Sequence, residues 1–390
     1  MRSTVVIAAV AVGLFAGMFM MAFFRGLAKE EVKSAVELQL SHIQLHNPAF
    51  PADRAVNYTI ANSSPIIAEL KNNSGVKAVS GRVITAGMAS SASAALGVEI
   101  HGIRPAEEKL ISSISEDVAE GDYFLENRKN EILIGKKLAE KLGLGLHSKI
   151  VLTFQSVSGD LTSGSFRITG IFHSPNSSFD LSTVFTRLDD LSELLGTGDQ
   201  IHEIAVLLND GRFVDPVAAG LKKTYPRLLV QSWKEISPEM ALLTDLFDQV
   251  LYIIIGIILL ALMFGIINTM LMAVLERQHE FGMLMAIGMN KQKVFLMIVY
   301  ESLILTCIGI PAGILFTISS VYFLAGRGID LSAFSKALSQ YGFGNRVFPE
   351  LDPGMFLPIT LMTALTALLS AIYPAIKALQ CKPVEAIHKI

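Results

Sequence analysis

Four long apolar runs restrict this 390-residue chain to a membrane protein more firmly than any other feature of its sequence. Residues 4–24 and 250–275 contain no charged side chain, residues 294–325 contain only Glu301, and residues 355–379 contain only Lys377. Because a helix rises about 1.5 Å per residue, each run is long enough to cross a hydrocarbon core about 30 Å thick. The sequence therefore predicts four transmembrane helices, and the third carries the helix-perturbing set Gly309, Pro311 and Gly313.

The first run, TVVIAAVAVGLFAGMFMMAFF, could instead be a cleaved signal peptide. Its apolar stretch is longer than the roughly 7–15 residues of a typical signal-peptide core, and the following MAFFRG offers no small-x-small cleavage site. We therefore expect residues 1–24 to be an uncleaved signal-anchor helix.

Basic residues in the short loops predict the orientation, since such loops carry more lysine and arginine on the cytoplasmic side. The loop 326–354 opposes this bias only partly, with Arg327, Lys336 and Arg346. We expect both termini in the cytoplasm and residues 25–249 outside. The basic residues that share the cytoplasmic face are Arg2, Arg277, Lys291, Lys293, Lys377, Lys382 and Lys389.

The polar region between the first two runs alternates strand-like and helical patterns, which predicts a large α+β domain inserted between transmembrane helices 1 and 2. Strands are expected over residues 75–90, 96–105, 131–135, 148–155, 165–173 and 202–210, and helices over 136–142 and 188–195. At its borders, apolar residues at helical spacing predict that both membrane helices continue outward and pack together as a stalk; two unrelated surface helices are the alternative. These residues are Val32, Val36, Leu40 and Ile43, then Met240, Leu243, Leu246, Phe247 and Val250.

The composition argues against several classes of function. A net charge of -3 without a long basic run disfavours nucleic-acid binding, and the two cysteines, Cys307 and Cys381, lie outside the polar domain. Its histidines show no paired metal-ligand spacing, and neither a nucleophile elbow nor a phosphate-binding loop is present. We therefore expect a binding or gating domain with no catalytic, cofactor-binding or metal-ligating residues.

The segment ERQHEFGMLMAIGMNKQK, residues 276–293, separates the second and third runs. Its apolar residues recur at steps of three and four, which predicts an amphipathic helix along the cytoplasmic membrane surface. Gly282 and Gly288 each cost a helix interior about 1 kcal/mol, so they suggest close approach of another surface. A docking helix and a plain interfacial linker both fit these residues.

Three polar residues within the runs need a partner, because polar groups are costly in hydrocarbon. Glu301 lies about two turns after Lys293, so we expect it to hydrogen-bond the 276–293 segment near the cytoplasmic interface rather than relay protons. Asn268 and Thr269 are expected to pack and hydrogen-bond between helices.

Several motifs resemble known families. The pattern ERxxEFGxLxAIG, with Glu301 and GIPAG after it, and the ending YPAIKALQCKPVEAI are similar to the FtsX-type permease domain. The stretches GVEIHGIRPAEE, AEGDYFLENRKNEILIGKKLAEKLGLGLHSKIVLTF and FRITGIFHSPNSSFDLSTVFTRLDDL resemble the periplasmic core domain of MacB-type permeases. The family usually begins with a basic amphipathic helix, whereas only residues 1–3 precede the first run here.

The resemblance implies a type VII ABC permease that works as a pair, with a homologous sister subunit or a second copy. A separate ATPase subunit would bind ATP, so no cofactor is expected in this chain. Residues 276–293 would be the coupling helix, which passes ATP-driven motion to the periplasmic domain by mechanotransmission. The expected coupling residues are Glu276, Glu280, Phe281, Gly282, Leu284, Ala286, Gly288 and Met289.

The stand-alone permease length and the stalk followed by SHIQLHNPAF resemble the lipoprotein-releasing, LolC/LolE-like type more than toxin exporters. This resemblance implies a bacterial inner-membrane subunit that extracts lipoproteins, with lipoprotein cargo or a periplasmic carrier as a partner. The alternatives are MacB-like efflux of peptides, antibiotics or toxins, and FtsX-like signalling to a cell-wall hydrolase. The large outer domain disfavours the signalling alternative.

Overall fold

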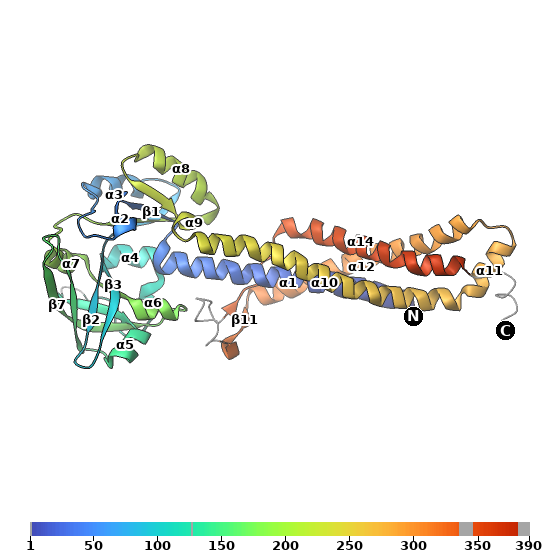
Figure 1. Ribbon diagram of the computed structural model, residues 1–390, viewed down its shortest axis with the longest axis horizontal. Coiled ribbons are helices and arrows are strands. Elements are labelled where there is room, and N and C mark those ends of the chain that lie inside the picture. The colour runs from blue at the N-terminus through green and yellow to red at the C-terminus, as the bar shows by residue number, and fades with distance from the viewer. Residues whose placement is uncertain (1, 126–127, 335–345, 381–390) are drawn as a thin grey trace. The chain divides into compact units, whose positions relative to one another are not determined.

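A computed structural model describes residues 2–125, 128–334 and 346–380 (Figure 1), and they divide into two compact units. The first unit contains Met1–Lys29, Leu243–Asp330 and Arg346–Ile390, and the second contains Glu30–Leu242 and Leu331–Asn345. Lys336 and the predicted tail beyond residue 380 lie outside the described residues.

Four long helices dominate the first unit: α1 (Arg2–Ala35), α10 (Pro238–Glu276), α12 (Lys291–Ala325) and α14 (Pro353–Leu379). Each is long and apolar enough to cross a membrane, over Ser3–Leu40, Gln249–Glu276, Lys291–Ala325 and Pro353–Leu379. The prediction of four apolar membrane helices is confirmed. Shorter elements of this unit are α11 (Gln278–Ala286), β11 (Ile329–Asp330) and β12 (Arg346–Val347).

Glycines of α12 allow α1 to approach closely. A Cβ at Gly309 would lie 2.9 Å from the Cβ of Val10, and one at Gly313 would lie 2.8 Å from the carbonyl oxygen of Ala11. Such small-residue contacts are a common basis of helix packing in membranes. The set does not end the helix, since α12 continues through Gly309, Pro311 and Gly313.

The end of α1 is joined to the segment that leads into α14. Arg25 forms an ion pair with Asp352, and one turn later Lys29 Nζ lies 2.6 Å from Glu350 Oε1. The backbone N–H of Glu350 also donates to the carbonyl of Ala22 at 3.0 Å. We call these contacts the α1 clasp.

Gly26 lies inside the α1 clasp, where the two backbones touch. A Cβ at this position would lie 2.1 Å from the carbonyl oxygen of Phe348, a distance that no side chain can occupy. The close approach therefore requires glycine.

The second unit is a mixed domain of short helices around one large sheet (Figure 1). Its strands are β1 (Ile43–His46), β2 (Val76–Ser90), β3 (Ala95–Ile103), β4 (Val118–Gly121), β5 (Glu131–Gly135), β6 (Lys149–Gln155), β7 (Leu161–Phe172), β8 (Thr183–Arg187), β9 (Glu203–Leu208) and β10 (Leu229–Ser232). Its helices are α2 (Phe50–Asp53), α3 (Ser63–Lys71), α4 (Pro105–Ile111), α5 (Lys136–Leu142), α6 (Ser177–Ser182), α7 (Leu188–Leu195), α8 (Val214–Thr224) and α9 (Trp233–Ile236).

The sheet has ten strands in the order β10-β1-β9-β2-β3-β8-β5-β7-β4, with β6 paired to β2 and β7. Most neighbours are antiparallel, whereas β3 with β8 and β5 with β7 are parallel. Helices α3 and α4 pack on β2, and α7 packs on β3. All six predicted strands and both predicted helices are present, so the α+β character of the domain is confirmed.

Both helices continue beyond their apolar runs as expected, α1 to Ala35 and α10 from Pro238, but their packing together as a stalk stays a prediction, and the expected end of the first helix is wrong. Val36 belongs to the core of the second unit, and Val32, Leu40 and Met240 pack against that core. The expected helical position of Ile43 is wrong: the helix becomes a π-helix over Val36–Leu40, Ser41 adopts a φ of 54°, and Ile43 begins β1. There Ile43 pairs with strands on both sides, β9 and β10, which secures its backbone better than another helical turn would.

A buried ion cluster holds the centre of this sheet. Arg82 on β2 is 2% exposed and donates to Glu108 on α4 at 2.6 and 3.1 Å and to Glu203 on β9 at 2.8 Å. Because a buried charge without a partner is very costly, these three side chains must be placed together. The cluster thus fixes how α4 lies against the sheet.

Candidate functional site

Helix α11 is a short helix between two candidate membrane spans, and its inner face is firmly packed. Phe281 is 1% exposed in a cluster with Val274 of α10 and Val294 of α12. Leu284 and Met289 pack against the same cluster. The predicted apolar spacing therefore produces one buried face, which fixes α11 to the helices on either side.

The helix ends earlier than the sequence predicted, at Ala286, and Gly288 is not in its interior. Gly288 has a φ of 103°, its N–H donates to the carbonyl of Met285, and the N–H of Met289 donates to that of Leu284. These two bonds form a Schellman motif, in which glycine is preferred because its backbone turns left-handed. Gly288 thus terminates α11, so its expected position in a helix interior is wrong, whereas the close approach of a partner surface stays a prediction.

Arg277 connects α11 to the third span. Its Nε donates to Glu280 at 2.9 Å, and its Nη1 lies 3.3 Å from both carboxylate oxygens of Glu301 on α12. Its guanidinium carbon also lies 5.5 Å from the ring centre of Phe281. The hydrogen bond to Glu280 and the charge of Glu301 raise the pKa of Arg277, so this side chain is a permanent cation between α11 and α12.

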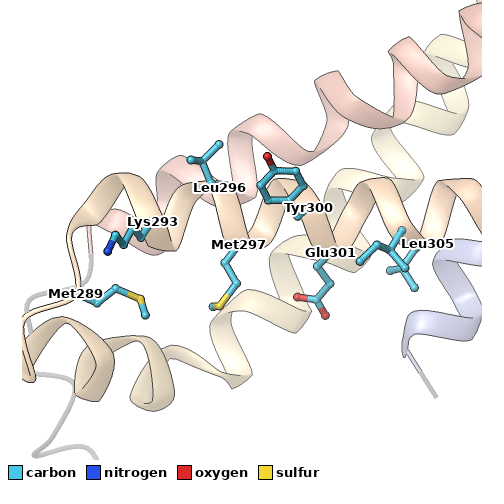
Figure 2. A pocket seen from close by; sticks show the side chains of 8 residues that line it. Met289, Lys293, Leu296, Met297, Tyr300, Glu301 and Leu305 are labelled. Carbon is cyan, nitrogen blue, oxygen red and sulfur yellow. The ribbon is translucent and has the colours of Figure 1, made fainter.

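A groove of about 610 Å³ runs along α12 next to this ion pair (Figure 2). Glu301 and Lys293 are its charged side chains; the others are mainly apolar. Figure 2 shows Met297 and Glu301 on one side of α12 and Leu296 and Tyr300 on the other. The lining residues are Met289, Lys293, Leu296, Met297, Tyr300, Glu301, Ile304 and Leu305.

The structure divides the predicted coupling residues into two groups. Glu276, Glu280, Ala286 and Gly288 are exposed, so they can meet a partner, whereas the other predicted positions face inward fully or partly. The inward residues are Phe281, Gly282, Leu284 and Met289. The coupling role of all eight residues stays a prediction. The exposed group would contact the partner directly, and the inward group would support the helix from behind.

Ile287 is the residue that the sequence reasoning overlooked. It is 86% exposed beside the terminating glycine, and Met283 on the same helix is 43% exposed. An isoleucine directly before a glycine that can end a helix was a usable signal, because large exposed apolar side chains often mark contact surfaces. Arg277 was also not singled out as the partner of Glu301.

The polar residues of α10 do not join helices as expected. Thr269 Oγ1 donates to the carbonyl of Gly265 in its own helix at 2.9 Å, so the interhelical bond predicted for it is wrong. Asn268 is exposed and, among the contacts of the described residues, makes no hydrogen bond. A membrane helix readily satisfies a hydroxyl internally, whereas an amide needs another molecule.

Four candidate spans, a large mixed domain and a short exposed helix between two spans define a multi-pass membrane protein with a substantial domain outside the bilayer. The sequence profile of the MacB-like periplasmic core domain matches residues 3–224, and that of the FtsX-like permease C-terminal domain matches residues 252–383. The chain belongs to the family of MacB/FtsX-type permeases, and it is an ABC-transporter permease of this type.

Two relatives are distant in sequence but align over most of the chain. The lipoprotein-releasing system transmembrane protein LolE of Haemophilus influenzae is 23% identical over 88% of this chain and 84% of its own length. LolC of Neisseria meningitidis, from the same kind of system, is 21% identical over 98% of this chain and 92% of its own. Among solved structures, the extracellular domain of the noncanonic ABC-type transporter YknZ from Gram-positive bacteria is 18% identical over 49% of this chain and 99% of its own, with a TM-score of 0.35.

Proposed function

We propose that this chain is the permease subunit of a lipoprotein-releasing ABC transporter in a bacterial inner membrane. The names of its full-length relatives support this cargo, since both belong to lipoprotein-releasing systems and align over most of the chain. In this proposal α11 and both termini face the cytoplasm, the second unit faces the periplasm, and the basic short-loop residues support that orientation.

The observation that carries the coupling part of the proposal is the construction of α11. Its outer surface presents Ile287, Glu280 and Ala286, while its inner surface is anchored by Phe281 and by the bridge from Arg277 to Glu301. A helix that is exposed on one side and fixed to two spans on the other transmits a push instead of bending. An ATPase subunit that binds ATP would dock here, and its closure would move α10 and α12 together.

The direct test is an affinity purification of the tagged full-length chain from its native membrane in mild detergent, with mass spectrometry of the bound proteins. An ABC ATPase together with acylated lipoproteins or a periplasmic lipoprotein carrier supports the proposal. An ATPase with a periplasmic adaptor and an outer-membrane channel instead supports MacB-like efflux, which the match to the MacB-like core domain keeps as the second candidate.

The coupling site is tested by Ile287→Glu. We expect roughly a tenfold loss of ATPase recovery, because a charge in the middle of an apolar contact costs about 1–2 kcal/mol or more. Phe213→Glu is the matched control, since Phe213 is also a large apolar side chain, 58% exposed, but lies in the second unit. Equal recovery of the ATPase with wild type and Ile287→Glu would contradict docking at α11.

A further inference from the structure

A groove lined by four cations opens in the second unit where the segment before β5 meets β6 and β7. Arg128 and Lys129 come from that segment, Lys149 from β6 and Arg167 from β7, and the hydroxyl of Ser165 lies beside them. The groove has a volume of about 560 Å³. All four cations are exposed, and the groove is separate from α11 in the chain and in the fold.

Two of these cations are directly opposite each other. Lys149 pairs with Arg167 in the antiparallel register of β6 and β7, so both side chains point to the same exposed face of the sheet. Like charges at directly opposite positions destabilise a sheet. Within the described part of the chain neither forms an ion pair, and the acidic residue paired with Arg167 on its other side, Glu131 of β5, already bonds Arg187.

The backbone holds the other two cations at the same place. The N–H of Arg167 donates to the carbonyl of Asn130 at 2.8 Å, and the N–H of Asn130 donates to Asp190 at 2.6 Å. Asn130 has a φ of 56°, which gives a tight turn directly after Lys129. The segment therefore remains at the edge of β7.

Nearby carboxylates cancel little of this charge. Glu131 also lines the groove, but it is 2% exposed and accepts a hydrogen bond from Arg187 at 3.0 Å. Glu193 lies 3.9 Å from Lys129, and both side chains are about 80% exposed, where an ion pair contributes little. The groove is thus left with a net positive charge.

We infer that this groove binds a phosphate-type anion. Guanidinium groups hold phosphate through paired N–H donors, and lysine and serine add further donors. A protein partner fits less well, because protein interfaces have an apolar centre and the one apolar lining residue, Phe166, is 1% exposed. The anion would relieve the repulsion between Lys149 and Arg167. This inference goes beyond the proposed transport function and does not depend on ATPase coupling.

The test follows thermal unfolding of the full-length chain in detergent by the fluorescence of Trp233, the only tryptophan, which lies in the core of the second unit. Inorganic phosphate at about ten times its dissociation constant should raise the unfolding midpoint by roughly 3–6 °C. The double variant Lys149→Gln with Arg167→Gln should lose most of this rise. It should also unfold no earlier than wild type without phosphate, because the repulsion is gone.

The matched control is Lys223→Gln with Arg227→Gln, which removes the same charges from exposed positions outside the groove. Phosphate also stabilises proteins generally by exclusion from their surface, so equal rises in wild type and both double variants would overturn the inference.

Glycerophosphoglycerol in place of phosphate distinguishes the sources of the anion. A groove-dependent rise at lower concentration than with phosphate assigns a phospholipid headgroup, and a rise with phosphate alone assigns a free phosphate or phosphomonoester. If neither compound raises the unfolding midpoint in a groove-dependent way, the site is contradicted.

Discussion

His202 lies inside the second unit with both ring nitrogens hydrogen-bonded. Its Nδ1 accepts from the N–H of Ile84 at 3.0 Å, which assigns the proton to Nε2, and Nε2 donates to the carbonyl of Val56 at 2.9 Å. A second proton on Nδ1 would point at the N–H of Ile84, which is itself a donor. Burial lowers the pKa of His202, and burial likewise lowers the pKa of His46.

We therefore predict that the second unit loses stability as the pH falls below about 6.5, the ordinary histidine pKa. In that range the unfolded chain binds protons that the folded chain does not, so the free energy of unfolding decreases by up to about 1.4 kcal/mol per pH unit for each histidine. Burial raises the pKa of Asp180, which has the opposite effect at lower pH, so measurements should stay above about pH 5.

Urea unfolding of the full-length chain at pH 7.5 and 5.5, followed by Trp233 fluorescence, checks this prediction. His202→Gln should flatten the pH dependence, whereas His147→Asn should leave it unchanged, because His147 is exposed. An unchanged slope in His202→Gln would show that other groups cause the acid sensitivity.

At the scale of elements, the α1 clasp allows a matched pair of glycine substitutions. Gly26→Ala should destabilise the first unit by about 1–3 kcal/mol, because its Cβ would overlap the backbone of Phe348. Gly256→Ala in α10 should be neutral or stabilising, since its Cβ meets nothing within 4 Å and alanine favours a helix by about 1 kcal/mol.

The measurement is the temperature at which half of the detergent-solubilised chain leaves its monodisperse peak in size-exclusion chromatography. A lower temperature for Gly26→Ala alone supports the clasp. If both variants behave as wild type, α1 and the segment before α14 are not in contact in solution.

Elements in which apolar side chains recur at a regular period over many residues could be predicted from the sequence. Elements that depend on pairing with residues far away in the sequence could not. Apolar period and length predicted the four spans, β5 and α7 correctly. Strand β1 was missed because the helical spacing of Val36 and Leu40 continues to Ile43, and only pairing with β9 and β10 makes that residue a strand.

The candidate site shows the same limit. The sequence placed an amphipathic helix at α11 and an acid near it, but the partner of that acid depends on how α12 returns past Arg277. Gly288 was misassigned because a glycine near a helix end reads equally as a packing position or as a terminator, and only its φ of 103° decides.

At the scale of the whole molecule, we predict that the exposed Asn268 lies in the contact between two permease subunits. Its amide lies within the candidate span Gln249–Glu276, where hydrogen bonds between helices contribute about 0.6–2 kcal/mol. In the proposed permease pair, Asn268→Leu should weaken association of two permeases roughly 3- to 30-fold.

Disulfide cross-linking through Phe264→Cys, an exposed position one turn away on the same helix, measures this association in membranes. The yield should fall when Asn268→Leu is added, and Met272→Leu is the control for a change on the same face. Equal yields would place Asn268 toward lipid or another subunit.

The α1 clasp also has a consequence for how the protein is made. Arg25 and Lys29 belong to α1, whereas their partners Asp352 and Glu350 follow 327 and 321 residues later in the chain. Until Glu350 and Asp352 have been synthesised, neither cation has its carboxylate partner from the α1 clasp, and the backbone of Phe348 does not yet lie beside Gly26. The α1 clasp therefore forms only after translation has passed Asp352, so the membrane unit is completed late in synthesis.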